Sequence, residues 1–298
     1  MYIAKTIAIL KGKFKVSKLP LLSELKSFNK FWELHSQKKD VALLNWYEDN
    51  ASFSLLRAIS YLFYFIYIRA AFKKVIWIRH NIAPHHNRHG ILYKAFVYIL
   101  SSYCDRKITH KPMKGFDFIP HINYIEQVTR VSSPVRDVEF LIFGQIKKYK
   151  GIDELLKTWP TNLKLVIIGK CTEPQLELDI NDIIVNRGLD VEFTNKFIDQ
   201  KELNKLLLKT KQVIIPNEDN SMIVSGVFYH AASFGANILL KEGGLYDFLS
   251  NEYSFVKKLN SIGIDSYQVV NDKQVIDEIE NKNSNRIVLQ YYEKFIRD

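Results

Sequence analysis

The sequence contains little cysteine and no long hydrophobic run. Cys104 and Cys171 are the two cysteines in 298 residues, which excludes a disulfide-rich scaffold and a cysteine-based zinc module and fits a reducing compartment. The apolar run between Arg57 and Arg69 has 11 residues, against about 20 for a helix that crosses a membrane. The first residues, MYIAKTIAILKGK, lack the pattern of a signal peptide. We therefore expect a cytoplasmic protein.

Two nucleotide-binding fingerprints are also missing. No GxGxxG follows the first strand, and GxxxxGK[ST] does not occur. The first absence argues against a nucleotide-dependent oxidoreductase of the dinucleotide-binding type, and the second excludes a Walker loop. A phosphate site in this chain must therefore be built from other residues.

Positive charge is concentrated in the first part of the chain. The sequence has 42 Lys and Arg against 32 Asp and Glu, a net charge of +10. Residues 1–130 hold 21 of these basic residues and 8 of the acidic ones. A basic surface attracts nucleic acid, anionic lipid or an anionic substrate, although a lysine-rich composition alone is the alternative. No nucleic acid is expected as a partner, since the aromatic residues lie in apolar runs and no RNP or zinc-finger pattern occurs.

Strands and helices alternate along the whole sequence, as judged from hydrophobic periodicity. The predicted strands are 2–10, 40–46, 74–80, 107–110, 138–144, 163–169, 191–197, 212–216 and 237–240. The predicted helices are 21–35, 53–72, 89–104, 151–159, 202–209, 227–234 and 286–298. This alternation predicts an α/β protein of two Rossmann-like domains with parallel sheets.

The predicted boundary between the two domains lies in TRVSSPVRD, where a Ser-Ser-Pro turn precedes a new strand. We expect an N-terminal domain over residues 1–130 and a C-terminal domain over 131–285. The helix over 286–298 would then be free to pack back on the first domain.

Polar residues follow many of the predicted strands in both halves. Ligands of open α/β sheets bind beyond the carboxyl ends of the strands. In the first half these positions hold Glu48 and Asp49 after one strand, and His80, His85 and His86 after the next. Strand ends are commonly polar, but the repeated histidines and aromatics favour a cleft between two facing domains.

The segment FGQIKKYKGIDELL carries the strongest local signal. Its strand ends at Phe143, Gly144 permits a close turn, and lysines precede a helix that begins near Gly151. Lysine ammonium groups beside a helix N-terminus form a phosphate site; a solvated basic turn is the alternative. Ser225 and Gly226 open a second helix after a strand. Two such loops in one α/β domain favour a diphosphate site over a plain helix cap.

Five segments, in order over about residues 40–250, resemble bacterial GT-B glycosyltransferases of the surface-polysaccharide, family 4-like type. FGQIKKYKGIDELL is similar to G-R/Q-hydrophobic-x-x-x-K-G, and SGVFYHAASFGANILL is similar to S-G-x-x-x-x-A-x-S-F-G-x-P-hydrophobic. WIRHNIAPHH resembles W-T-hydrophobic-H-N-x-x-P-H-E/D. LLNWYED and FIPHINY resemble two further elements of that group.

The resemblance implies transfer of a sugar from a nucleotide-diphosphate donor, UDP- or GDP-linked, to a glycan or undecaprenyl-linked acceptor in O-antigen, capsule or exopolysaccharide synthesis. The first domain would bind the acceptor and the second the donor. The donor site it implies comprises Gly144, Gln145, Lys147, Lys150, Ser225, Gly226 and Val227, with Asn195 and Phe197 at the base. No cofactor or metal is implied: cationic side chains and helix dipoles stabilise the leaving group, and D-x-D is absent.

The catalytic residues are less defined. Met222 and His230 stand where many retaining members carry two glutamates, which weakens the case for retaining chemistry of that type. An inverting reaction needs a general base for the acceptor hydroxyl. The candidates are Glu48, Asp49, His80, His85 and His86, with Glu48 favoured and His80 and His85 next. His85, His86 and His89 alone do not make a zinc site.

Two further hypotheses concern partners. An aromatic run flanked by basic residues would suit the inner face of the plasma membrane, with a buried helix between the sheet and the C-terminal helix as the alternative. It comprises Tyr61, Phe63, Tyr64, Phe65 and Tyr67, with Arg57, Arg69, Lys73 and Lys74 at its ends. A non-catalytic GT-B-like paralogue that assists another transferase is the alternative function.

Overall fold

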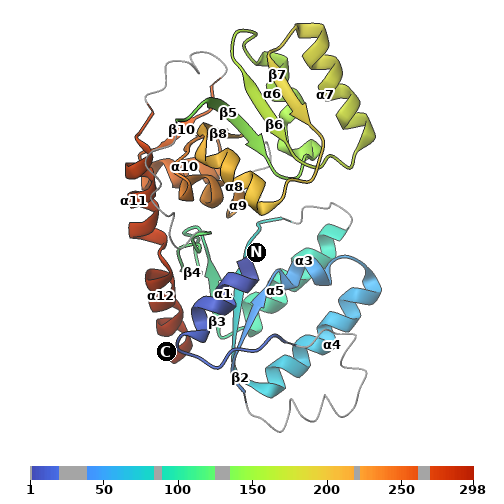
Figure 1. Cartoon of the computed structure of the whole chain (residues 1–298). Helices are drawn as coiled ribbons and strands as arrows, with labels where there is room; N and C mark the ends of the chain where they lie inside the picture. Colours follow the sequence, from blue (N-terminus) through green and yellow to red (C-terminus); the bar gives the residue numbers. More distant parts are fainter. Residues whose placement is uncertain (1, 20–38, 84–88, 125–134, 218–221, 261–268) are drawn as a thin grey trace. The chain divides into compact units, whose positions relative to one another are not determined.

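The computed structural model describes residues 2–19, 39–83, 89–124, 135–217, 222–260 and 269–298. The chain forms two compact units (Figure 1). The first comprises Met1–His121, Ser221–Val224 and Arg286–Asp298, and the second comprises Ile122–Asn220 and Ser225–Asn285. The boundary predicted between residues 130 and 131 and the predicted helix 21–35 lie outside the described residues.

The first unit is built on a parallel sheet of four strands in the order β1-β2-β3-β4. Residues 75–78 of β2 form a Val-Ile-Trp-Ile run that is buried on both faces, as a central parallel strand requires. The strands are β1 (Lys39–Asn45), β2 (Phe72–Arg79), β3 (Arg106–Thr109) and β4 (Asp117–Phe118).

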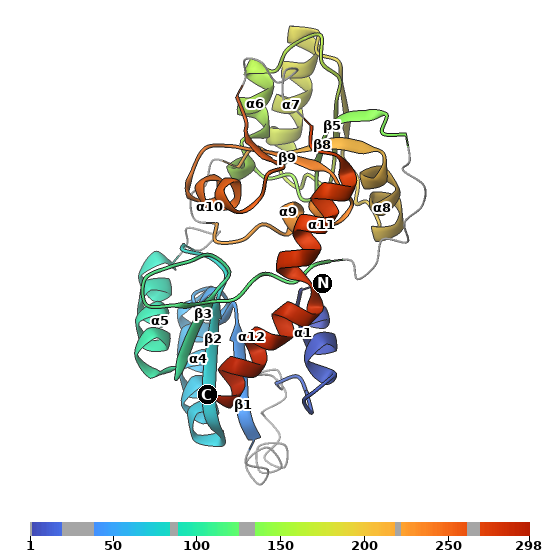
Figure 2. The same cartoon turned by 90° about the vertical axis from the view of Figure 1, so that its left-hand side faces the viewer.

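Helices cover both faces of this sheet. α4 (Leu55–Ala71) connects β1 to β2, and α5 (Gly90–Tyr103) connects β2 to β3. Because both crossovers run in the same direction and are right-handed, the two helices share one face, and both contribute to one apolar cluster with the sheet. Figure 2 shows α1 (Tyr2–Lys11) and α12 (Asn285–Arg297) on the other face.

The prediction of a strand over residues 2–10 is wrong, because this segment forms the helix α1. Its buried residues are Tyr2, Thr6, Ile9 and Leu10, a spacing that puts them on one side of a helix. The tyrosine hydroxyl lies 3.2 Å from the Tyr292 hydroxyl of α12. The apolar residues of YIAKTIAIL fit the period of a strand as well as that of a helix. Packing against α12 favours the helix.

The second unit contains a parallel sheet of six strands in the order β10-β9-β8-β5-β6-β7. Its apolar core includes the fully buried Trp159 and Leu165. The strands are β5 (Val138–Phe143), β6 (Leu165–Ile168), β7 (Val191–Thr194), β8 (Thr210–Ile215), β9 (Asn237–Leu240) and β10 (Val256–Lys258). The helices are α6 (Ile152–Thr158), α7 (Pro174–Arg187), α8 (Gln200–Leu208), α9 (Gly226–Ser233), α10 (Gly244–Glu252) and α11 (Asp272–Asn283).

These two parallel sheets confirm the predicted fold class of Rossmann-like α/β units. The sequence reasoning missed α7, α10, α11, β4, β10 and the short helix α3 (Tyr47–Ala51). α7 and α11 are polar helices, rich in charged residues and amides, so they contain no continuous apolar run that would mark them in the sequence.

Candidate functional site

The ends of β5 and β6 approach each other closely in the second unit. The amide of Gly144 donates to the carbonyl oxygen of Ile168 at 3.1 Å, and Gly144 has a φ of 97°, which favours glycine. A Cβ atom on Gly169 would overlap the carbonyl oxygen of Gly144. The two glycines therefore let two strand-end loops lie in backbone contact at the carboxyl edge of the sheet.

The three lysines of the loop after β5 have different surroundings. Lys147 donates to the Thr172 hydroxyl at 2.7 Å and pairs with Glu173 at 3.3 Å. Lys148 is exposed and pairs with Asp153. Lys150 is half-buried, and its side-chain ammonium has no hydrogen bond or ion pair within the described residues. Among the residues that the structure describes, the loop therefore holds one cation without a protein counter-charge.

Lys150 lies close to Gly144 at this edge. Its Nζ is 3.7 Å from the position that a Cβ atom on Gly144 would take, and the Cγ2 of Val227 is 3.8 Å from the same point. Burial lowers the pKa of Lys150 to about 8, because a desolvated ammonium loses the hydration that stabilises its charge. A bound anion would supply the missing charge.

The N-terminus of α9 lies beside this lysine. Ser225 is the N-cap residue, and its hydroxyl accepts from the amide of Phe228 at 3.3 Å. The first amides of a helix have no partner within the helix, and those of Gly226 and Val227 stand at that end. Both predicted phosphate loops of the second unit therefore meet at the same edge of its sheet.

The other predicted donor residues surround this edge less directly. Gln145 is exposed. Asn195 accepts from the amide of Cys171 at 2.9 Å, so its side chain joins the loops after β6 and β7. Phe197 is 81% exposed, which leaves its ring open to a planar ligand.

In the first unit, Glu48 is fully buried. Its Oε2 accepts from the Trp77 indole at 2.8 Å, and its Oε1 has no hydrogen-bond partner. Burial is the main cause that raises the pKa of Glu48 to about 7. A carboxyl group without exposed surface does not reach an acceptor in this conformation. The neighbouring Asp49 is half-buried and accepts from the Asn81 amide at 2.9 Å.

His80 is also buried. Its Nε2 lies 2.9 Å from the Asn45 Oδ1, and its ring stacks on Trp46 at 3.8 Å. Its Nδ1 is buried without a partner. Burial lowers the pKa of His80 well below the usual value, and His110 and His121 add to this effect. Burial therefore favours the neutral imidazole of His80. His85 and His86 lie outside the described residues.

The two positions that correspond to glutamates in retaining enzymes have other roles. Met222 forms an isolated antiparallel bridge with Asn81. His230 is buried on α9, with its Nε2 3.0 Å from the Gln200 amide and 3.1 Å from the Asn204 Oδ1. Neither side chain supplies a carboxylate.

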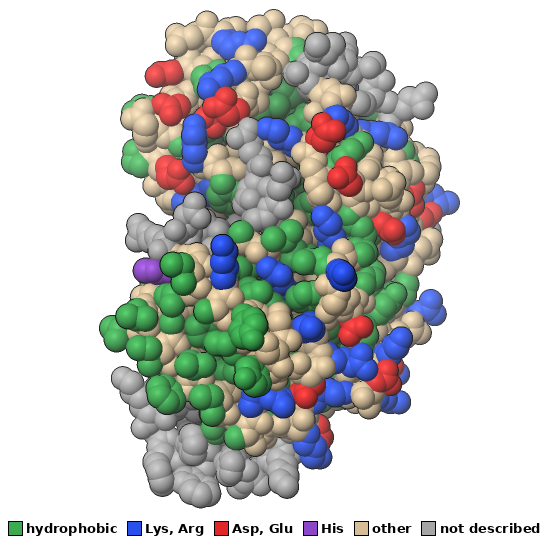
Figure 3. Space-filling model, turned by 180° about the vertical axis from the view of Figure 1, so that it is seen from behind, with side chains coloured by type: hydrophobic (Ala, Val, Ile, Leu, Met, Phe, Trp, Pro, Cys, Tyr) green, Lys and Arg blue, Asp and Glu red, His purple; other side chains and the backbone are tan. Residues whose placement is uncertain are grey.

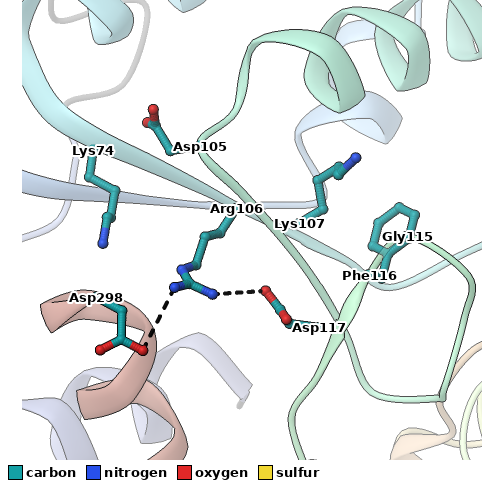
Figure 4. Close-up of a pocket in the computed structure, with 8 residues that line it drawn as sticks. All are labelled: Lys74, Asp105, Arg106, Lys107, Gly115, Phe116, Asp117 and Asp298. Atoms are coloured by element: carbon teal, nitrogen blue, oxygen red, sulfur yellow. Dashed lines mark hydrogen bonds and ion pairs between the residues drawn. The ribbon is translucent and has the colours of Figure 1, made fainter.

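A cavity of about 500 Å³ lies in the first unit, at the edge of the sheet where the strands begin (Figure 4). It is lined by residues at the beginnings of β3 and β4, and Arg106 pairs there with Asp117 at 3.3 Å and with Asp298 at 3.7 Å. Since ligands of parallel sheets bind at the carboxyl edge, this cavity is separate from the candidate site.

No protein-family model and no curated protein matches the sequence. Solved structures do match. HepE from Anabaena, in complex with UDP and glucose, has a TM-score of 0.68 at 11% identity over 93% of this chain and 81% of that chain. The fold is that of the GT-B glycosyltransferases. Sucrose-phosphate synthase from Thermosynechococcus elongatus gives a TM-score of 0.66 at 12% identity, over 95% of this chain and 80% of that one.

A third similar structure is the UDP-forming α,α-trehalose-phosphate synthase from Burkholderia vietnamiensis. Its TM-score is 0.58 at 9% identity, over 91% of this chain and 84% of that one. Within the described residues, no group of three or more His, Cys, Asp or Glu side chains is arranged to hold a metal ion. In the same part of the chain, no helix is long and apolar enough to cross a membrane.

Proposed function

We propose that this protein is a glycosyltransferase that uses a nucleotide-diphosphate-sugar donor. The observation that carries the proposal is Lys150, a half-buried cation without a counter-charge among the described residues, beside Gly144 and the first turn of α9. The same edge of the sheet carries a cation, a close-approach glycine and helix amides, which together suit a diphosphate. The GT-B fold and the UDP and glucose named for the HepE structure support this reading.

In this proposal the protein stabilises the leaving diphosphate with its own groups. Lys150 neutralises it, and the Ser225 hydroxyl and the amides of Gly226 and Val227 bind its oxygens. Gly144 allows the phosphate to approach the backbone, with Gln145 at the loop surface. Lys147 contributes after exchanging Glu173 for phosphate. Preorganised cations and amides supply the stabilisation that a metal gives elsewhere, so transfer is expected without one.

Asn195 and Phe197 would contact the base of a UDP- or GDP-sugar. The exposed Phe197 ring offers a stacking surface, and Asn195 holds the adjoining loops together.

The acceptor we propose is a glycan or an undecaprenyl-linked oligosaccharide of a bacterial surface polysaccharide. This part rests on the resemblance of LLNWYED and WIRHNIAPHH to acceptor-domain segments of such enzymes. Asp49 suits the role of general base better than Glu48, because the Asp49 side chain is half-buried whereas that of Glu48 is fully buried. Glu48 then acts through its bond to Trp77, which fixes the start of α3.

A non-catalytic nucleotide-binding relative that assists another transferase is the second candidate. The burial of Glu48 and His80 favours it, since neither side chain reaches solvent or a substrate in this conformation. This candidate shares the donor site and differs only in turnover.

Calorimetric titration with UDP, GDP, CMP and dTDP tests the donor site. We expect one diphosphate nucleotide to bind, and Lys150→Ala to weaken its binding at least about tenfold. Lys148→Ala is the matched control, because that lysine is exposed and already paired. Equal binding by wild type and Lys150→Ala would refute the site. Slow hydrolysis of the matching nucleotide sugar would support the enzyme; tight nucleotide binding without hydrolysis or transfer would favour the second candidate.

A further inference from the structure

Helix α4 is apolar on both of its sides. One side is buried against the sheet and includes Ala58, Tyr64, Phe65 and Ile68. The other side is exposed, with Leu56 at 80% and Phe63 at 68%. The exposed large residues are Leu55, Leu56, Ile59, Leu62, Phe63 and Ile66. Their spacing of three and four places them in one stripe along the helix.

The stripe differs from the aromatic run expected from the sequence. Of those aromatics, Tyr64 and Phe65 are buried, and Phe63 is exposed. The exposed side is therefore mainly aliphatic. Packing against the sheet accounts for the apolar residues on the buried side of α4, but it does not account for those on the exposed side.

Helix α5 extends the surface, because it packs on the same face of the sheet as α4. Its outward residues include Ile91, 86% exposed, and Tyr98, 72% exposed. We call the exposed side chains of these two helices the α4–α5 face. Figure 3 shows hydrophobic side chains gathered on one side of the first unit. Contiguous exposed apolar surface of this kind marks an interaction site.

The charged residues around the α4–α5 face indicate which kind of partner it binds. Residues 50–104 contain no Asp or Glu, although the chain has 32 of them, and they contain seven Lys or Arg. Arg57 and Lys94 lie on the two helices, are exposed, and make no ion pair within the described residues. Arg57 lies over the Phe53 ring at 4.8 Å. The face thus combines aliphatic side chains with unpaired cations.

We propose that the α4–α5 face binds the surface of an anionic lipid bilayer. Aliphatic side chains of an interfacial helix enter the boundary between headgroups and acyl chains, and the basic residues contact lipid phosphates. A second copy of this chain fits less well, because a two-fold contact would bring the same unpaired cations together without any carboxylate. The inference goes beyond the proposed function and does not depend on it.

Vesicle flotation of the full chain tests this proposal. The vesicles are phosphatidylcholine alone and phosphatidylcholine with about one third phosphatidylglycerol, each at low and high salt. We expect flotation with the anionic vesicles and less with the neutral ones. High salt should weaken binding without abolishing it, since screening acts on charge and not on apolar contact.

Leu56→Glu and Phe63→Glu change exposed side chains and are not expected to unfold the chain. Each should weaken vesicle binding about tenfold or more. Val185→Glu is the matched control, because Val185 is 76% exposed on α7 in the second unit. The double variant Arg57→Gln, Lys94→Gln should weaken binding to anionic vesicles about tenfold and leave binding to neutral vesicles unchanged.

Two results would overturn the proposal. One is absence of flotation by the wild type on every vesicle. The other is equal flotation by Leu56→Glu and wild type. If sedimentation instead shows a dimer that Leu56→Glu dissociates, the face is a contact between copies of this chain. Nucleotide titration of each variant keeps this test separate from the donor site, because the α4–α5 variants should bind nucleotide as wild type does.

Discussion

Lys150 makes the affinity for a nucleotide diphosphate depend on pH. In the free protein, burial lowers its pKa to about 8. A bound diphosphate favours the ammonium and raises that pKa, so binding above pH 8 requires uptake of a proton. The affinity should be constant below about pH 7 and should fall as pH rises through 8.

The size of this effect follows from the fraction of charged lysine. With a pKa of about 8, nearly all of Lys150 is charged at pH 7 and about one tenth at pH 9. We therefore expect the dissociation constant to rise about tenfold between these values. Lys150→Met should lose the charge-assisted bond, weaken binding about 10- to 100-fold, and remove the dependence on pH.

Calorimetric titration at pH 7, 8 and 9 measures this, with the diphosphate nucleotide that binds the wild type. The secondary phosphate group is already ionised over this range. Lys150→Arg keeps a charge at every pH used and should give a flat profile. A tenfold change that persists in Lys150→Arg and Lys150→Met would refute the reasoning, because the titrating group would then be elsewhere.

The remaining predictions concern stability and the glycine contact. Gly169→Ala should lower the free energy of unfolding by about 3 kcal/mol, because the new Cβ overlaps Gly144; urea unfolding measures this, and Gly90→Ala, where a Cβ meets nothing within 4 Å, is the control. The pKa of Glu48 is raised to about 7 in the folded protein, so the stability that the protonated carboxyl contributes is lost as pH rises from 4.5 through 7. Glu48→Gln should therefore raise the free energy of unfolding at pH 8 by about 2 kcal/mol. Equal melting temperatures of the variant and the wild type at pH 8 would contradict this. The pKa of Lys150 is lowered by burial, so the stability of the wild type should rise with pH between 8 and 10.5. Lys150→Met should have a higher melting temperature than the wild type at pH 7. A lower melting temperature of this variant would show that the ammonium of Lys150 has a stabilising partner in the folded protein. Ser225→Ala removes the cap of α9 and should cost about 1 kcal/mol in thermal unfolding, whereas an unchanged value would mean that the cap contributes nothing.

The sequence predicted the parallel sheets because their strands are short, fully apolar runs between turn residues, such as VIWI in β2 and LVII in β6. It failed at residues 2–10, where the choice between helix and strand depends on contacts with α12, such as that between Tyr2 and Tyr292, 290 positions apart. No local pattern contains that information.

The candidate site was predicted in part. Strand ends and glycines indicated the loop after β5 and the start of α9. The sequence could not distinguish the three lysines of that loop, because only the fold puts Thr172 and Glu173 beside Lys147 and Asp153 beside Lys148. The sequence could not predict that Glu48 is buried and accepts a hydrogen bond from Trp77, because the exposure of Glu48 depends on neighbours from another strand.

The first unit is made of segments from both ends of the sequence, and this affects the order in which the protein folds during synthesis. Residues 286–298 supply α12, whose Val288, Tyr292 and Phe295 are buried. The Lys74 ammonium of β2 donates to the carbonyl oxygen of Phe295 at 3.2 Å. These residues are translated after the second unit, so the part of the first sheet that α12 covers stays exposed while the second unit is translated. The unit whose synthesis begins first is therefore completed only after the second unit has been translated, and the sheet surface that α12 later covers is one that a chaperone would meet on the nascent chain.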